Sequence, residues 1–198
     1  MKLSPQQRQQ FDQDGYLFFP GLFTAQETRH LADAVPELYA RREAYNVREK
    51  GSDAVRTNFA AHLVSRPFAK LARHPRMIEP VQELFAEKLY MHQFKINGKM
   101  AFEGDVWQWH QDYGTWLNDD MMPTERAMNV AIFLDEVNEF NGPLMFIPGS
   151  HKQGALPAGP FGETMPAGTK RPSASKLPLP PARSTSCAIS SLSTVQSG

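Results

Sequence analysis

The sequence predicts an α+β fold in which helices come first and strands follow. Two helix-start signals stand near the beginning of the chain, Ser4-Pro5-Gln6-Gln7 and Thr24-Ala25-Gln26-Glu27. Each pairs a hydroxyl residue with a Gln or Glu three positions later, which is the pattern of a capping box. Farther along, short apolar runs are closed by turn residues, as where Pro148-Gly149 follows Leu144–Ile147. Helices that precede the strands, rather than alternate with them, favour α+β over α/β.

The predicted elements of the first half are mostly helical. In order, they are a helix from Ser4 to Gly15, a strand over Tyr16–Phe19, a helix from Thr24 to about Tyr45, and helices over 66–73 and 76–86. Leu31, Val35 and Leu38 share one face of the long helix, and Pro36 inside it can introduce a kink. Residues 46–65 are polar and mixed, so we expect a loop with short pieces of structure there.

The second half is predicted to be all-β as far as residue 154. The expected strands cover residues 89–97, 107–110, 127–134 and 144–147. The tail over 155–198 differs in composition, because 29 of its residues are Pro, Ser, Ala, Gly or Thr. Such a segment buries too little apolar surface to offset the entropy of ordering, so we expect a disordered tail.

Length and charge set the class of protein. A chain of 198 residues suits one domain, and Lys plus Arg balance Asp plus Glu at 21 each. The balance gives no sign of a nucleic-acid partner, and the lack of a long apolar run argues against a membrane span. The single cysteine, Cys187, excludes an internal disulfide framework. We therefore expect a cytoplasmic protein without a nucleic-acid or membrane partner; oligomeric state is not indicated.

The strongest chemical signal is the pair His110 and Asp112. If Trp107–His110 is a strand that continues, residues two apart point to one face, and an imidazole would stand beside a carboxylate. Two His and one carboxylate form the facial triad of non-haem iron(II) enzymes, which leaves three positions open on the metal. Aromatic residues surround the pair and indicate a desolvated pocket: Trp107, Trp109, Tyr113 and Trp116. The alternative is a core strand with a hydrogen-bonded His–Asp pair.

Four motifs stand in residues 11–154. They are Asp14-Gly15-Tyr16-Leu17, Trp109-His110-Gln111-Asp112-Tyr113-Gly114-Thr115-Trp116, Met122-Pro123-Thr124-Glu125-Arg126, and Asn141-Gly142-Pro143-Leu144 with Pro148-Gly149-Ser150-His151-Lys152. Together they resemble the motifs of the phytanoyl-CoA-dioxygenase-like family of iron(II)- and 2-oxoglutarate-dependent oxygenases. The second is similar to the ligand segment of ectoine hydroxylases, although those enzymes usually carry Ser and Phe where this chain has Gln111 and Tyr113.

The resemblance implies a double-stranded β-helix, or cupin-type jelly-roll, with N-terminal helices over residues 1–154. It implies Fe(II), 2-oxoglutarate and dioxygen as cofactor and cosubstrates, with His110 and Asp112 as iron ligands and the hydroxylation of a small molecule. Lys99 is expected to hold 2-oxoglutarate, and Gln93 to face the site beside the substrate. Tyr113 and Trp116 are expected to line the substrate pocket, with core packing as the alternative for Trp116. The substrate stays open among compatible solutes, amino acids, acyl-CoA and natural-product scaffolds.

One part of the family pattern is missing. The family's third ligand is a His well downstream of the PGSHK motif, followed by an Arg that holds 2-oxoglutarate, yet no His follows His151. We do not expect His151 to bind metal, and we expect Arg126 to pair with Asp119 or Asp120. The jelly-roll should be incomplete at its C-terminus, and residues 155–198 should be disordered or translated out of the family's reading frame. Three hypotheses follow: an oxygenase inactive as written, a two-ligand enzyme, and a non-enzymatic binding module.

Overall fold

The computed structural model describes residues 1–100, 107–138, 141 and 143–157, together with the backbone of 175–176, 185–191 and 196–197. Helices occupy the first half: α1 (Pro5–Asp14), α2 (Ala25–Ala32), α3 (Val35–Ala40), α4 (Ala61–Val64), α5 (Arg66–Leu71) and α6 (Pro75–Phe85), and α7 (Asp112–Asp119) follows later. The strands are β1 (Tyr16–Phe23), β2 (Asn46–Arg48), β3 (Val55–Phe59), β4 (Lys95–Asn97), β5 (Met128–Ile132), β6 (Met145–Phe146), β7 (Ser175–Lys176), β8 (Thr185–Ser191) and β9 (Gln196–Ser197). A short 3-10 helix covers Ser150–Gln153. No helix in the described part of the chain has the length and apolar character that crossing a membrane requires.

Both predicted capping boxes are confirmed. Ser4 accepts from the Gln7 amide while the Gln7 side chain accepts from the Ser4 amide, and Thr24 and Glu27 do the same for α2. The first helix ends where predicted, since Gly15 takes a left-handed conformation (φ 84°) that a glycine adopts without strain. The predicted long helix is two helices in the structure: α2 ends at Ala32, and α3 ends at Ala40.

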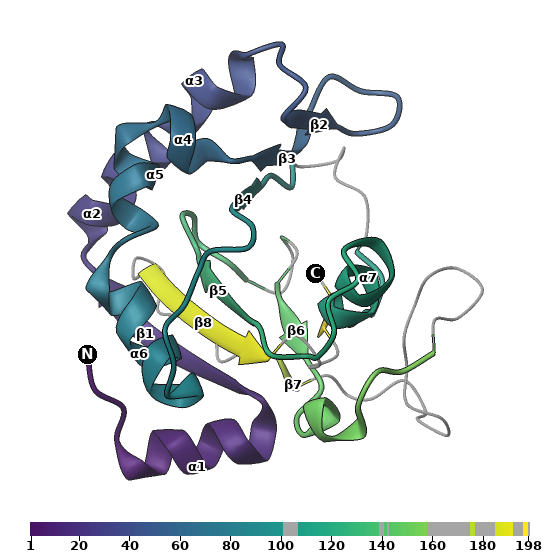
Figure 1. The fold of residues 1–198 in the computed structure, drawn as a ribbon. Helices are drawn as coiled ribbons and strands as arrows, with labels where there is room; N and C mark the ends of the chain where they lie inside the picture. The colour runs from purple at the N-terminus through teal and green to yellow at the C-terminus, as the bar shows by residue number, and fades with distance from the viewer. Residues whose placement is uncertain are drawn as a thin grey trace.

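The strands form three small sheets (Figure 1). Their orders are β1-β8-β5, β2-β3-β4 and β7-β6-β9, and every pairing is antiparallel. Strand β1 runs past Pro20 and Gly21, where we predicted it to stop, by means of a register shift between Phe19 and Phe23. The predicted strand over 89–97 is shorter than expected and covers only Lys95–Asn97.

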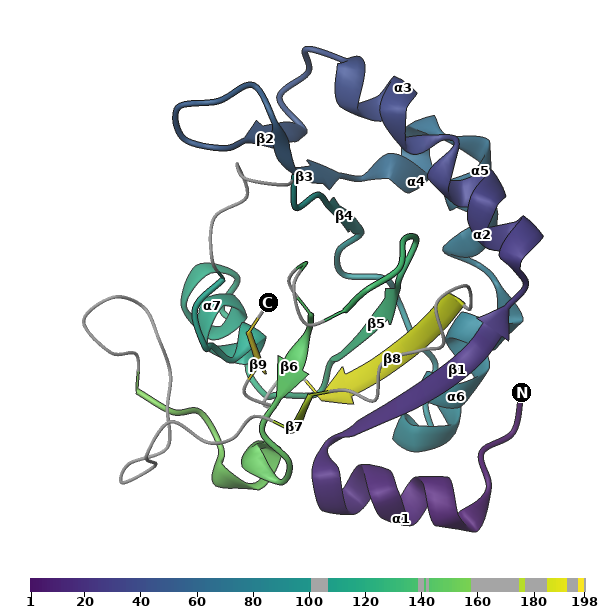
Figure 2. The ribbon, with the colours of Figure 1, turned by 180° about the vertical axis from the view of Figure 1, so that it is seen from behind.

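Strand β8 lies in the middle of the first sheet, between β1 and β5, in both views of the ribbon (Figures 1 and 2). We predicted a disordered tail over residues 155–198, whereas the described backbone of Thr185–Ser191 forms a paired strand. Strand β8 supplies the backbone hydrogen-bond partners that the facing edges of β1 and β5 would otherwise lack. Backbone pairing of this kind depends little on side-chain size. Most of the rest of the tail lies outside the described residues.

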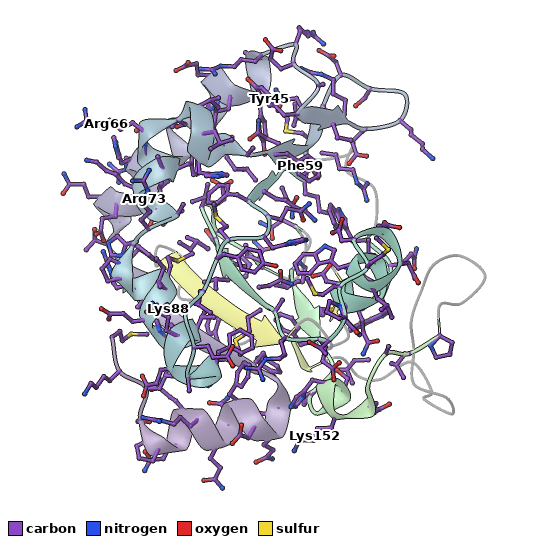
Figure 3. All side chains as sticks on the ribbon, in the orientation of Figure 1. Tyr45, Phe59, Arg66, Arg73, Lys88 and Lys152 are labelled. Carbon is purple, nitrogen blue, oxygen red and sulfur yellow. The ribbon has the colours of Figure 1, made fainter. Side chains whose placement is uncertain are left out.

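Two of the hydrophobic clusters lie on opposite faces of the β1-β8-β5 sheet. On one face Leu17 and Phe19 pack with Leu3, Phe11 and Val81, so α1 and α6 cover that face. On the other face Tyr16 and Phe18 pack with Phe133, Leu144 and Phe146, which brings the β6 sheet over it. Figure 3 shows side chains filling the space between β3–β4 and β5, whereas Arg66 and Arg73 project outward from the helical layer.

Candidate metal centre

His110 and Asp112 come together, but not by the local structure that we predicted. The strand expected over Trp107–His110 is not formed; His110 makes an isolated bridge and Asp112 is the first residue of α7. Gln111 between them is extended (φ −108°, ψ 128°) and precedes the helix as its N-cap. This turn from extended chain into helix brings His110 Nε2 to 3.5 Å from Asp112 Oδ1.

A second hydrogen bond orients each of the two side chains. His110 Nδ1 lies 2.6 Å from the Gln108 carbonyl oxygen, so Nδ1 carries the proton and donates, which leaves Nε2 as the basic nitrogen. Asn129 donates from Nδ2 to Asp112 Oδ2, and Oδ1 is the oxygen on the side of His110. A His whose other nitrogen donates to a carbonyl is the usual arrangement of a metal-binding imidazole.

The spacing of the two donor atoms fits a metal ion. Bonds of about 2.0–2.2 Å from nitrogen and oxygen ligands allow both atoms to reach one ion across a separation of 3.5 Å. Within the part of the chain that the structure describes, no group of three His, Cys, Asp or Glu side chains gathers to hold a metal. The residues present therefore fit an iron site with two protein ligands.

The pKa values of the pair shift in opposite directions. Burial works against charge on both groups, but the hydrogen bond and charge between them outweigh it, so the pKa of His110 is raised and that of Asp112 is lowered. The hydrogen bond from Asn129 and the charge of Lys95 lower the pKa of Asp112 further. The carboxylate is therefore held in the anionic form that binds a metal cation.

A positive charge reaches the pair from β4. Lys95 acts electrostatically on both His110 and Asp112, and its ammonium lies 5.7 Å from the centre of the Phe59 ring on β3. In a strand, Lys95 shares a face with Asn97, whose Oδ1 accepts from the Thr57 hydroxyl at 3.2 Å. Strands β3 and β4 thus present a lysine and a fixed carboxamide on one face.

The other predicted site residues are placed as follows. Gln93 and Lys99 are exposed and lie on either side of β4. Tyr113 and Trp116 are buried on α7 and pack with Met122 and Ala127, and the Trp116 ring lies 4.9 Å from the ring of His92.

Arg126 and His151 have roles elsewhere in the fold. Arg126 pairs with Glu87 at 2.8 Å, not with Asp119 or Asp120, because Glu87 follows α6 and lies beside it. His151 donates from Nε2 to the Asp12 carbonyl at 3.2 Å and so docks the PGSHK turn on α1.

Sequence reasoning missed Lys95 and Asn129. A signal existed for each: Lys95 stands two residues from Gln93 and from Asn97 in a strand pattern, and Asn129 is the one polar residue in an apolar run of eight, AMNVAIFL. Neither pattern reveals that the Asn129 side chain contacts Asp112 or that the charge of Lys95 acts on the pair, because both depend on where α7 lies.

We expect Asn129→Leu to weaken metal binding about 10- to 100-fold, the usual cost of losing an outer-shell partner. Without the donated hydrogen bond, the Asp112 carboxylate can rotate and its Oδ1 is no longer fixed toward His110 Nε2. Cobalt(II) titration followed by visible absorption measures the dissociation constant. Asn118→Leu is the control, since Asn118 donates to the Gly114 carbonyl on the exposed side of α7. Equal affinities in the two variants would remove Asn129 from the site.

Comparison with known proteins identifies the family of the chain. The family model for phytanoyl-CoA dioxygenase (PhyH) matches residues 11–181. Ectoine dioxygenase from Bordetella bronchiseptica is 38% identical over 157 residues, which are 76% of this chain and 50% of the relative. L-proline trans-4-hydroxylase from Streptomyces griseoviridis is 37% identical over 146 residues, which are 74% of this chain and 54% of the relative. The chain therefore spans about half the length of the curated relatives it matches.

Solved structures agree with the sequence relatives. The apoform of EctD from S. alaskensis superposes with a TM-score of 0.85 at 29% identity, covering 98% of this chain and 70% of that one. The same enzyme has been solved with bound Fe, and with 2-oxoglutarate and 5-hydroxyectoine. The α+β jelly-roll that the sequence predicts is the fold of these oxygenases. The chain belongs to the phytanoyl-CoA dioxygenase family.

Proposed function

We propose that this chain is the metal-binding part of an iron(II)- and 2-oxoglutarate-dependent dioxygenase that hydroxylates a small molecule. The observation that carries the proposal is the 3.5 Å approach of His110 Nε2 and Asp112 Oδ1, with Nδ1–H and Oδ2 each engaged by a second hydrogen bond. What distinguishes this pair from the ion pair of His92 with Asp120 is that its outer atoms, Nδ1 of His110 and Oδ2 of Asp112, are each oriented by a further hydrogen bond. The family membership supports the same function.

The bound iron would supply the oxidising chemistry, in which 2-oxoglutarate is converted to succinate while a substrate C–H bond becomes C–OH. His110 and Asp112 would hold the ion through one nitrogen and one oxygen. Lys95 would balance the negative charge of the 2-oxo acid, since its own charge already acts on both ligands. Buried Tyr113 and Trp116 would keep water from that side of the ligands.

The substrate is proposed to be a small polar molecule. The relatives include proteins named for ectoine and for L-proline, and both are small compared with an acyl-CoA. The described wall of the site supports such a substrate, because β3 and β4 present Thr57, Lys95 and Asn97 as well as the Phe59 ring.

We further propose that the 198 residues by themselves bind iron weakly and do not turn over. The sequence contains no His after His151, and no third His, Cys, Asp or Glu side chain joins His110 and Asp112 in the described part of the chain. The second candidate function, a small-molecule binding module with a vestigial metal site, is favoured by this same two-ligand arrangement.

The test is an anaerobic titration of the chain with Fe(II) in the presence of 2-oxoglutarate. A weak visible charge-transfer band is expected, because this band arises only when the 2-oxo acid chelates the iron. His110→Ala is the control and should give no band. A wild-type chain without the band, but with a small molecule bound, would favour the binding module. Succinate formed in air would disprove the proposed inactivity.

Lys95 and Lys99 can be separated by comparing two variants. We expect Lys95→Ala to weaken 2-oxoglutarate binding about tenfold while leaving cobalt(II) binding within about twofold, because the lysine acts on the anion. Lys99→Ala tests the lysine that the sequence predicted and serves as the matched control, since Lys95 and Lys99 are both exposed. If only Lys99→Ala weakens 2-oxoglutarate binding, the original assignment of Lys99 is restored and Lys95 is excluded.

A further inference from the structure

Gln111, between the two proposed ligands, is one of the most completely buried polar residues described. Its side chain is 2% exposed, whereas glutamine is usually a surface residue. A buried carboxamide is tolerated only when its donor and acceptor groups are bonded, so its partners indicate why it is there.

Both ends of the Gln111 amide bond to one backbone segment. Nε2 donates to the Gly154 carbonyl at 3.0 Å, and Oε1 accepts from the Leu156 amide at 2.8 Å. The side chain thus pairs with residues 154 and 156 as a neighbouring strand would, because a carboxamide offers the same donor and acceptor as a peptide group. These partners are more than forty positions away in sequence.

The segment that Gln111 holds is fixed in turn to the N-terminal helix. Gly149 N donates to the Asp14 carbonyl at 2.9 Å, and His151 Nε2 donates to the Asp12 carbonyl. The short helix Ser150–Gln153 joins these contacts to Gly154. A continuous path of hydrogen bonds therefore leads from the end of α1, through residues 149–156, to the residue between His110 and Asp112.

We propose that Gln111 is a positioning residue that couples the Gly154–Leu156 segment to the metal pair. His110 and Asp112 are the two chain neighbours of Gln111, which is the last extended residue before α7 begins. Fixing the Gln111 side chain fixes the backbone between the two ligands, and with it the 3.5 Å separation of Nε2 and Oδ1. The proposal rests on the proposed metal function and goes beyond it by linking the site to a distant segment.

Coupling has a measurable consequence on the distant side. If Gln111 links the metal pair to the Gly154–Leu156 segment, a metal bound at His110 and Asp112 stabilises that segment. The ordered segment then stabilises metal binding by an equal free energy. The Leu156 amide hydrogen, bonded to Gln111 Oε1, should therefore exchange with solvent more slowly when metal is bound.

The test compares Gln111→Met with Asn46→Leu. Asn46, on β2, is a matched control. It is also buried, and its side-chain amide donates to the backbone carbonyls of Leu38 and Arg41. We expect Gln111→Met to weaken cobalt(II) binding at least about tenfold and to abolish the metal-dependent slowing of Leu156 exchange. Asn46→Leu should lower stability comparably and leave cobalt(II) affinity unchanged.

Gln111→Glu keeps an oxygen for the Leu156 amide but loses the donor to Gly154, so it should retain part of the coupling. It also serves if Gln111→Met does not fold. Cobalt(II) affinity equal to wild type in whichever of these variants folds would overturn the proposal, as would metal binding by the wild type that leaves Leu156 exchange unchanged. A wild-type chain that binds no cobalt(II) would instead overturn the metal function on which the proposal rests.

Discussion

Asp112→Ala should abolish iron binding at any accessible concentration, the largest functional effect expected from one substitution in this chain. The change removes one of two protein ligands, and its cost should exceed the roughly 10- to 100-fold that an outer-shell partner contributes. It also removes the charge that raises the pKa of His110 and the group that Asn129 orients. Cobalt(II) and Fe(II) titrations of wild type and variant measure the loss directly.

Asp112→Asn provides the control for shape. Asparagine keeps an oxygen near His110, and its NH2 group can donate to Asn129 if the Asn129 amide turns over, but it has no negative charge to hold the cation. We expect Asp112→Asn to bind metal far more weakly than wild type and to be no less folded, as judged by circular dichroism. Metal affinity in Asp112→Ala equal to that of wild type would place the metal elsewhere.

Phe146→Ala should cost about 3–5 kcal/mol of the free energy of unfolding, the usual loss for a fully buried phenylalanine. Its side chain is 1% exposed, and its ring stacks on Tyr16 at 4.9 Å between centroids. This contact joins β6 to β1, so the cavity would open between two sheets. Because small domains have only about 5–15 kcal/mol of stability in total, the variant should be near its folding limit.

Urea unfolding, followed by tryptophan fluorescence, measures the effect of Phe146→Ala against Phe146→Leu. Leucine retains much of the apolar contact and should lose a minor part of the stability. A loss below about 1 kcal/mol in Phe146→Ala would mean that the surrounding residues close over the cavity and that the two sheets do not depend on this contact.

Local signals in the sequence were enough to predict the first helices. The capping boxes at Ser4 and Thr24 and the left-handed Gly15 involve residues within a few positions of one another, so no distant contact can override them. The long helix was predicted without its break after Ala32, because Val35 and Leu38 keep the apolar spacing across the interruption.

The ligand pair could be predicted from residue types and from family motifs, but its geometry could not. Alternation along a strand predicted one shared face for His110 and Asp112, whereas Asp112 begins a helix. Asn129 and Lys95 come to the pair from β5 and β4, and such partners depend on how the sheets and α7 are placed. The sequence indicated the proposed ligands, but it could not indicate the residues that orient them or add charge beside them.

Strand β8 could not be predicted because its composition resembles that of a linker. Thr185–Ser191 consists of small residues with one Ile and one Cys, and a Pro-rich segment precedes it. Its place is set by partners: Ile189 pairs with Leu17 and Val130, and Cys187 pairs with Phe19 and Ile132. Strands β1 and β5 already carry the apolar side chains, so the strand between them needs little more than its backbone.

The central place of β8 also sets the order of events when the chain is made. Tyr16 and Asn129 share a partner in Ser190, so the two outer strands of this sheet meet only through a segment that is synthesised after both of them. Until Thr185–Ser191 leaves the ribosome, β1 and β5 both have exposed edges, and α1 and α6 cover a sheet that has no centre. When β8 pairs with β1 and β5, it joins distant parts of the chain. A sheet built from such distant pairings folds slowly and passes through states that are prone to association.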